Sequence, residues 1–302
     1  MPATLSRPEL QRRAGSTAAA PAGAGRLAAA DLLRSVAMVS VIAVHAVAWM
    51  AVFDPPAAAV YGTLDRLLRF GVPVFVFLTG YVLVHRYRDR RLDARRFVRG
   101  RVRRVIVPFI AWAAIYLACA MLFTPIRDQV HAAGDLVGLL WSGTVAGHLY
   151  FLPVALQFYV LFVLLPRGRR GVAALCAVAI PLQLALTALR ATGTLPADGL
   201  LGDLDDSHAQ WFFVWWIGYY ALGAAAATWR EPLERVVARH RPLALAAPVL
   251  VAPPVLLDLT NAGVQGYDEI LRPSILLLTA GVLVAGLAGD SASPPATAAW
   301  PR

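Results

Sequence analysis

The chain has 302 residues, of which 59% are hydrophobic and only 15% charged, and its mean hydropathy is +0.61. Soluble domains are about 45–50% apolar and about 25% charged. This composition excludes a soluble enzyme with one core, a disordered chain and a nucleic-acid-binding domain. The net charge of +10 does not indicate a nucleic-acid partner either, because the charges lie between apolar blocks. The composition therefore predicts a polytopic membrane protein, which has the lipid bilayer as a partner.

Eight uncharged blocks approach the roughly 20 apolar residues that a helix needs to cross a bilayer core about 30 Å thick. Backbone polar groups in lipid must be paired within the segment, so the blocks are predicted to be helices. We therefore expect an all-α transmembrane bundle of about eight spans. The predicted spans are residues 35–53, 70–85, 105–126, 148–166, 171–189, 207–229, 242–257 and 273–289.

Arginine supplies all 28 basic residues, and its distribution predicts the orientation. Of these, 22 fall in the N-terminal stretch and in the loops after the second, fourth and sixth spans. Cytoplasmic loops carry an excess of basic residues. The alternation predicts a cytoplasmic N-terminus, a cytoplasmic C-terminus and a cytoplasmic loop over residues 86–104.

The two ends of the chain differ in composition from the apolar middle. Residues 1–30 are rich in Ala, Pro and Arg, and residues 291–302 are rich in Pro and Ala. We predict a disordered cytoplasmic tail at each end and one membrane domain over residues 31–290. The first tail lacks the central apolar stretch of a cleavable signal peptide. Cys119 and Cys176 lie in apolar segments, so we expect neither a disulfide nor a metal site.

An ionisable side chain, His45, lies in the middle of the first predicted span. Such a group costs several kcal/mol unless it is paired, which makes it a candidate functional residue. Arg34 lies 11 residues earlier, which is three helical turns plus about 20°, so it shares a face with His45 at a rise of about 16 Å. Asp31 lies about 40° from that face. The alternatives are a structural histidine and an arginine that only anchors the helix.

Arg101 and Arg104 are three residues apart where the third predicted span begins, so they point the same way. Their guanidinium groups can hold a phosphate bidentately. The alternative is an ordinary arginine-rich loop attracted to anionic lipid.

Aromatic residues and one histidine mark the predicted outer side of the membrane. His148 opens the fourth span and is followed by Tyr150. Taken alone, His148 reads as an interfacial residue beside an aromatic belt. We expect Trp211, Trp215 and Trp216 to form such a belt as well.

Together these stretches resemble the acyltransferase-3 family of integral membrane acyltransferases. The resemblance covers about residues 27–230 and rests on the order and spacing of four stretches. A fifth, weaker stretch runs from Trp211 to Gly223. Thr79 stands where the family usually has Ser, and Tyr150 where it usually has Trp. Family members typically have ten spans, against the eight predicted here. The four stretches are residues 31–45, 71–81, 101–108 and 148–153.

The resemblance implies an O-acyltransferase in a bacterial plasma membrane that needs no metal and no nucleic acid. Acyl-CoA, with acetyl-CoA as the expected donor, would arrive from the cytoplasm with its phosphates held by Arg101 and Arg104. His45 would be the general base or a transient acyl carrier, and Arg34 would orient substrate or stabilise negative charge, held by Asp31. The acceptor would be a hydroxyl of a glycan, a lipid-linked sugar or a small metabolite. His148 and Tyr150 would line the site.

Two other readings stay open. One is a transporter or exporter that uses His45 as a proton relay, although no Asp or Glu lies in the middle of a predicted span. The other is a shortened, inactive family member that serves as a partner subunit, which the two fewer spans would favour.

Overall fold

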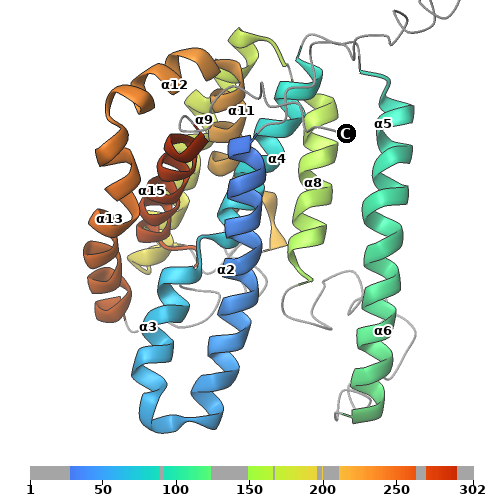
Figure 1. Cartoon of the computed structure of the whole chain (residues 1–302). Helices are drawn as coiled ribbons and strands as arrows, with labels where there is room; N and C mark the ends of the chain where they lie inside the picture. Colours follow the sequence, from blue (N-terminus) through green and yellow to red (C-terminus); the bar gives the residue numbers. More distant parts are fainter. Residues whose placement is uncertain are drawn as a thin grey trace, which may run out of the picture.

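The computed structural model describes residues 28–88, 92–123, 149–165, 167–195, 199, 211–262 and 270–290, which form helices and no strand (Figure 1). Each of the eight predicted spans contains a helix. The all-α membrane bundle is therefore confirmed. Among the described residues, five helices are long and apolar enough to cross a membrane, namely Ala28–Phe53, Pro55–Tyr87, Ala94–Leu122, Arg169–Ala191 and Arg241–Asn261. Phe151–Leu164 and Pro273–Gly289 are shorter apolar helices.

A helical hairpin opens the bundle. Helix α2 (Ala28–Phe53) turns through η1 (Pro55–Ala57) into α3 (Ala58–Leu68), and the hairpin extends beyond the start of α4 (Figure 1). The segment between the first two predicted spans is a helix, which was not among the predicted spans. Residues 28–30, from the predicted N-terminal tail, belong to α2, and Ala29 and Ala30 are buried. Residues 1–27 and 291–302 of the predicted tails lie outside the described residues.

The centre of the bundle is the contact between α4 (Gly71–Tyr87) and α11 (Ile217–Thr228). Two glycines let these helices approach closely. A Cβ atom on Gly80 would lie 2.2 Å from the Tyr220 carbonyl oxygen, and one on Gly223 would lie 2.0 Å from the Phe77 carbonyl oxygen. No side chain fits at either position unless the helices separate.

We expect Gly223→Ala to lower the melting temperature of the purified protein, because overpacking a tight contact costs about 1–3 kcal/mol. Gly62→Ala is the matched control, since Gly62 lies in α3 with nothing within 4 Å of its missing Cβ. Ala favours a helix over Gly by about 1 kcal/mol, so the control is neutral or stabilising. Equal melting temperatures for the two variants would contradict the close approach.

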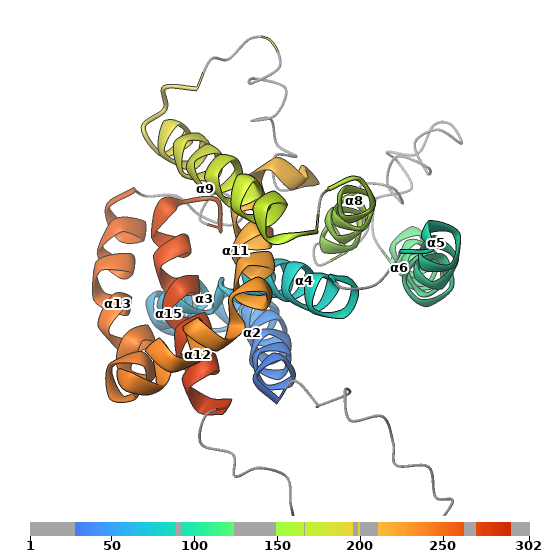
Figure 2. The ribbon, with the colours of Figure 1, turned by 90° about the horizontal axis from the view of Figure 1, so that it is seen from above.

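The other helices surround this pair (Figures 1 and 2). Seen from above, α6 stands at the edge of the bundle, beyond α8 (Figure 2). The helix ends that carry most of the arginines gather at one end, the upper one in Figure 1, as the predicted alternation requires. Which side of a membrane that end faces stays a prediction. The helices that surround the α4–α11 pair, besides α2 and α3, are α5 (Ala94–Arg101), the π-helical turn η2 (Val102–Ile106), α6 (Val107–Phe123), α8 (Phe151–Leu164), α9 (Arg169–Ala191), α12 (Arg230–Arg239), α13 (Arg241–Ala262) and α15 (Pro273–Asp290).

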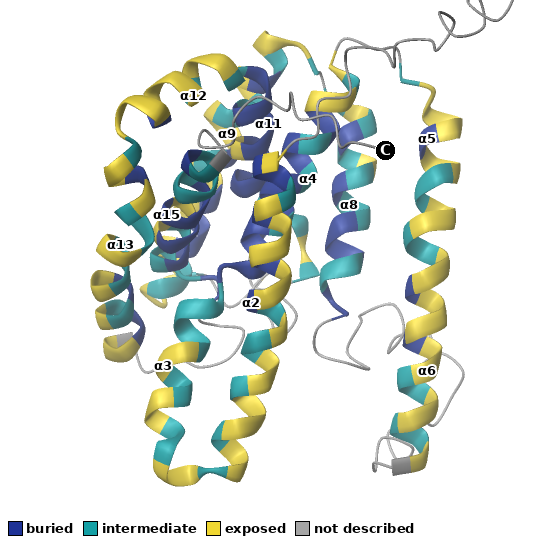
Figure 3. Cartoon of the chain, in the orientation of Figure 1, coloured by how far each residue is buried: buried dark blue, intermediate teal, exposed yellow. Residues whose placement is uncertain are grey.

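Burial separates a packed interior from apolar outer faces (Figure 3). The outer faces of α2, α6 and α13 expose large apolar side chains, such as Ile42 at 63% and Val249 at 73%. Contiguous exposed apolar surface of this kind marks contact with another apolar phase. It suits helices that face lipid tails.

The tryptophan belt predicted for residues 211–216 was wrong for Trp215 and Trp216, which are fully buried. They lie on η5 (Phe213–Trp216), which leads into α11. Two glutamines form hydrogen bonds with backbone groups of the segment that leads into α11. Gln157 accepts from the Phe213 amide at 3.1 Å and donates to the Trp211 carbonyl at 2.7 Å. Gln183 accepts from the Gly218 amide at 2.6 Å. Because these polar groups are paired, the segment can lie inside the bundle.

Candidate functional site

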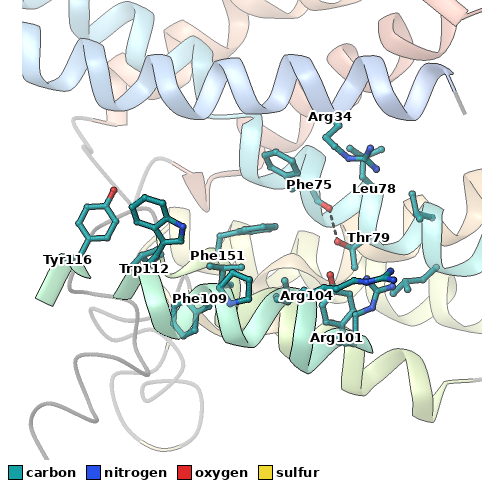
Figure 4. A pocket seen from close by; sticks show the side chains of 18 residues that line it. Arg34, Phe75, Leu78, Thr79, Arg101, Arg104, Phe109, Trp112, Tyr116 and Phe151 are labelled. Atoms are coloured by element: carbon teal, nitrogen blue, oxygen red, sulfur yellow. Dashed lines mark hydrogen bonds between the residues drawn. The ribbon is translucent and has the colours of Figure 1, made fainter. Parts of the chain in front are cut away.

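A cavity of about 610 Å³ opens between α2, α4, α8 and the α5–η2–α6 helix (Figure 4). It brings together three arginines that the sequence placed in two separate motifs: Arg34 from α2, and Arg101 and Arg104 from the start of the third predicted span. The rest of the wall is mostly apolar, from Phe75, Leu78, Thr79, Val82, Leu83, Val105, Pro108, Phe109, Trp112, Tyr116, Leu149, Phe151, Leu152, Ala155 and Tyr159.

Arg34 is held where the sequence predicted. Its Nη1 lies 2.8 Å from Asp31 Oδ1, across one turn of α2. Both side chains are nearly half exposed, so the pair adds little stability and leaves the guanidinium accessible from the cavity. Asp31 does not line the cavity and acts on it only through Arg34.

Arg101 and Arg104 face Arg34 from the opposite wall (Figure 4). The Arg101 guanidinium lies over two aromatic rings, 4.5 Å from the Tyr159 centroid and 5.0 Å from the Phe97 centroid. These contacts hold its planar group in one orientation. Arg103 lies between the two in sequence but does not line the cavity. Of the arginines in this arginine-rich stretch, Arg101 and Arg104 line the cavity.

The far part of this cavity is aromatic. Phe109, Trp112, Tyr116 and Phe151 line it, away from the arginines (Figure 4). The Thr79 hydroxyl donates to the Phe75 carbonyl at 2.9 Å, so it is engaged within its own helix. A cationic end and an apolar end suit a ligand that carries phosphates at one end and a less polar arm at the other.

His45 opens to a second, smaller cavity of about 160 Å³. His45 is exposed rather than packed in the core, and its side chain lines this cavity. Tyr150 lines the same cavity as His45, whereas His148 lies outside the described residues. The cavity is lined by Val41, Val44, His45, Leu68, Arg69, Gly71, Val72, Phe75, Tyr150, Phe151 and Ile270.

Two phenylalanines separate the cavities. Phe75 and Phe151 line both, and their ring centroids lie 5.4 Å apart. The structure thus divides the predicted site, with Arg34, Arg101 and Arg104 on one side of this aromatic pair and His45 on the other. The face of α2 that carries Arg34 and His45 contributes to both cavities, because Arg34 lines the large one and His45 lines the small one.

Sequence reasoning missed a partly buried ion pair beside His45. Arg69 lines the small cavity, and its Nε lies 2.9 Å from Asp65 Oδ2. The two side chains are only 12% and 15% exposed, and both charges act on the imidazole of His45. Among the described residues, Asp65 Oδ1 is buried without a hydrogen-bond partner. The signal in the sequence was an Asp–Arg pair at helical spacing, between the first two predicted spans.

The comparisons with known proteins fit this geometry. A family model described as an acyltransferase domain, acyltransferase-3, matches residues 27–294. The chain belongs to the acyltransferase-3 family. Searches of curated proteins and of solved structures each gave no match. The matched range includes both cavities of this membrane acyltransferase and all of its described helices. Within the described residues, no group of three His, Cys, Asp or Glu side chains is placed to hold a metal ion.

Proposed function

We propose that this acyltransferase moves an acyl group, with acetyl as the expected one, from acyl-CoA to a hydroxyl of a glycan, a lipid-linked sugar or a small metabolite. The observation that carries the proposal is the large cavity with Arg34, Arg101 and Arg104 at one end and aromatic side chains at the other. Guanidinium groups bind phosphates bidentately, and CoA carries its phosphates far from the thioester. The apolar end accepts the pantetheine arm.

The aromatic pair limits which part of the donor reaches His45. A donor held at Arg101 and Arg104 approaches the small cavity only past Phe75 and Phe151. A cavity of about 160 Å³ accepts a short acyl group and not a whole CoA. This size supports a short acyl chain on the donor.

His45 serves either as base or as carrier. As a base, its imidazole takes the proton of the acceptor hydroxyl while the oxygen attacks the thioester carbonyl, the C–S bond breaks and CoA leaves as a thiolate. As a carrier, an imidazole nitrogen attacks the thioester carbonyl, the C–S bond breaks and CoA leaves as a thiolate. The acceptor oxygen then attacks the acyl-imidazole, the C–N bond breaks, and the released imidazole takes up the hydroxyl proton. In both routes the imidazole becomes cationic for a time, beside the oppositely charged side chains of Asp65 and Arg69.

Membrane vesicles that display the arginine-rich face, incubated with acetyl-CoA labelled in its acetyl group, test the proposed function. With cell extract added as a source of acceptors, we expect label in the lipid, glycan or small-metabolite fraction with the wild-type protein and background label with His45→Ala. Equal labelling in the two preparations would overturn the proposal, and so would the absence of label with both. The same vesicles without the protein measure the background.

The transporter reading gains one observation from the structure. A proton relay through His45 needs a charged residue nearby, and Asp65 and Arg69 supply it from α3. Proteoliposomes with an internal pH dye separate the two functions. Proton uptake without acetyl-CoA that is lost in His45→Ala would favour the relay, whereas its absence together with acetyl labelling favours the acyltransferase.

A further inference from the structure

A third cavity, of about 380 Å³, lies at the arginine-rich end of the bundle. It is formed where the end of α4, the start of α9 and the junction of α11 with α12 meet. It shares no lining residue with the large cavity or with the His45 cavity. Its charged and titratable lining residues are His85, Arg88, Arg169, Arg230, Glu231 and Arg235.

The arginines of this cavity come from separate helices and are fixed by the fold. Arg88 donates to the Thr228 carbonyl at 3.2 Å, which ties the end of α4 to the end of α11. Arg235 donates to the Glu231 carbonyl at 3.4 Å, one turn earlier on α12. Arg88 and Arg230 both act electrostatically on His85. The cationic wall is therefore assembled by tertiary contacts and not by one run of sequence.

The charge balance of this wall calls for an anion. Four guanidinium groups line the cavity against one lining carboxylate, that of Glu231. Arg230 is also paired with Glu234, which lies outside the lining, so the wall still carries an excess of positive charge. Arginines that serve only as membrane anchors extend into water or among lipid head groups, where their mutual repulsion is least. Here they converge on one hollow, and guanidinium groups bind phosphate oxygens through paired, charge-assisted hydrogen bonds.

The position of the cavity agrees with that chemistry. Helix α12 runs across the arginine-rich end of the bundle in Figure 1 and buries Val237 against it. Arg235 and Arg239 on this helix are both exposed, and of the two only Arg235 lines the cavity. This end is predicted to be cytoplasmic, where both anionic phospholipids and soluble phosphate compounds occur.

We propose that this cavity is a phosphate-binding site, separate from the acyl-donor site, for an anionic phospholipid head group or a soluble phosphate compound. The inference does not rest on the proposed acyl transfer. It assigns a role to arginines that lie outside the large cavity and outside every motif of the sequence analysis.

The test measures binding to the purified full-length protein in detergent, with no acetyl-CoA present. The probes are phosphatidylglycerol in mixed micelles and inorganic pyrophosphate, each followed by the rise in melting temperature. Loss of a charge-assisted hydrogen bond weakens binding about tenfold or more, so Arg169→Ala combined with Arg235→Ala should weaken binding about a hundredfold. The matched control combines Arg170→Ala with Arg239→Ala, which removes the same charge from neighbouring positions that do not line the cavity.

Three results decide the proposal. Selective loss in the cavity variant supports it, and the probe that binds identifies the source as a lipid head group or a soluble phosphate. Equal losses of affinity in both double variants would show general electrostatic attraction without a specific site, and would overturn the proposal. Failure of both probes to bind the wild-type protein would overturn it as well. Glu231→Gln keeps the test decisive if the double variant does not fold. Removing the one carboxylate of the wall should tighten binding, and unchanged or weaker binding would contradict the site.

Discussion

His45→Ala should abolish acyl transfer while the protein still inserts and folds. The imidazole is the group in the small cavity whose usual pKa is near neutrality, so it can take up and return a proton at cellular pH. Because the side chain is exposed, its removal leaves no packing defect in the core. The measurement is transfer of labelled acetyl from acetyl-CoA, with size-exclusion profile and melting temperature as checks on folding. A loss of at least about a hundredfold is expected for a general base or a carrier.

Val44→Ala is the matched control, since Val44 lines the same cavity and carries no chemistry. Transfer by this variant should stay near the wild-type rate. His45→Gln refines the test, because an amide keeps a hydrogen bond but neither takes up the proton nor carries an acyl group. An active His45→Gln variant would show that the histidine is structural. Near-normal transfer by His45→Ala would remove it from the mechanism altogether.

The helices were predictable from the sequence because lipid leaves the backbone few alternatives. Apolar blocks of sufficient length must pair their own amides and carbonyls, and a helix does so. The same reasoning failed for α3. That segment carries Asp65, Arg66 and Arg69, so it is not an uncharged block and was not among the predicted spans. In the structure Arg69 pairs with Asp65, and Arg66 contacts Thr260 of α13.

The buried tryptophans were missed for a similar reason. Trp is enriched at membrane interfaces because its ring is amphipathic, so the sequence alone favours an interfacial position. Here Gln157 and Gln183 form hydrogen bonds with the backbone of the segment that leads into α11, so its tryptophans can lie inside the bundle. Their partners lie 35 to 56 residues away in sequence, so only the tertiary structure shows the contacts.

The candidate site was predictable in its parts but not in its arrangement. Helical spacing placed Arg34 near Asp31 and paired Arg101 with Arg104, and the structure places three of these four side chains on one cavity. Helical spacing could not show that Phe75 and Phe151 separate that cavity from His45. It also could not bring Asp65 and Arg69 to His45, because that requires α3 to pack against α2.

Arg101→Ala and Arg104→Ala should each weaken acetyl-CoA binding about ten- to hundredfold, because a hydrogen bond to a charged group contributes about 1.5–3 kcal/mol. Arg103→Ala is the matched control. It removes the same charge from the same π-helical turn, but Arg103 is exposed and does not line the cavity. The measurement is the dissociation constant of acetyl-CoA for each purified variant at one fixed salt concentration.

Lysine substitutions separate geometry from charge at these two positions. Arg101 stacks on Tyr159 and Phe97, so its planar guanidinium is both held and used for binding. Lysine keeps the charge but loses the planar fork and the stacking. Arg101→Lys should therefore recover less affinity than Arg104→Lys. Equal losses in Arg101→Ala, Arg103→Ala and Arg104→Ala would mean that a diffuse field attracts the donor. If binding is unchanged in Arg101→Ala and Arg104→Ala, the CoA phosphates bind elsewhere and the large cavity is not the donor site.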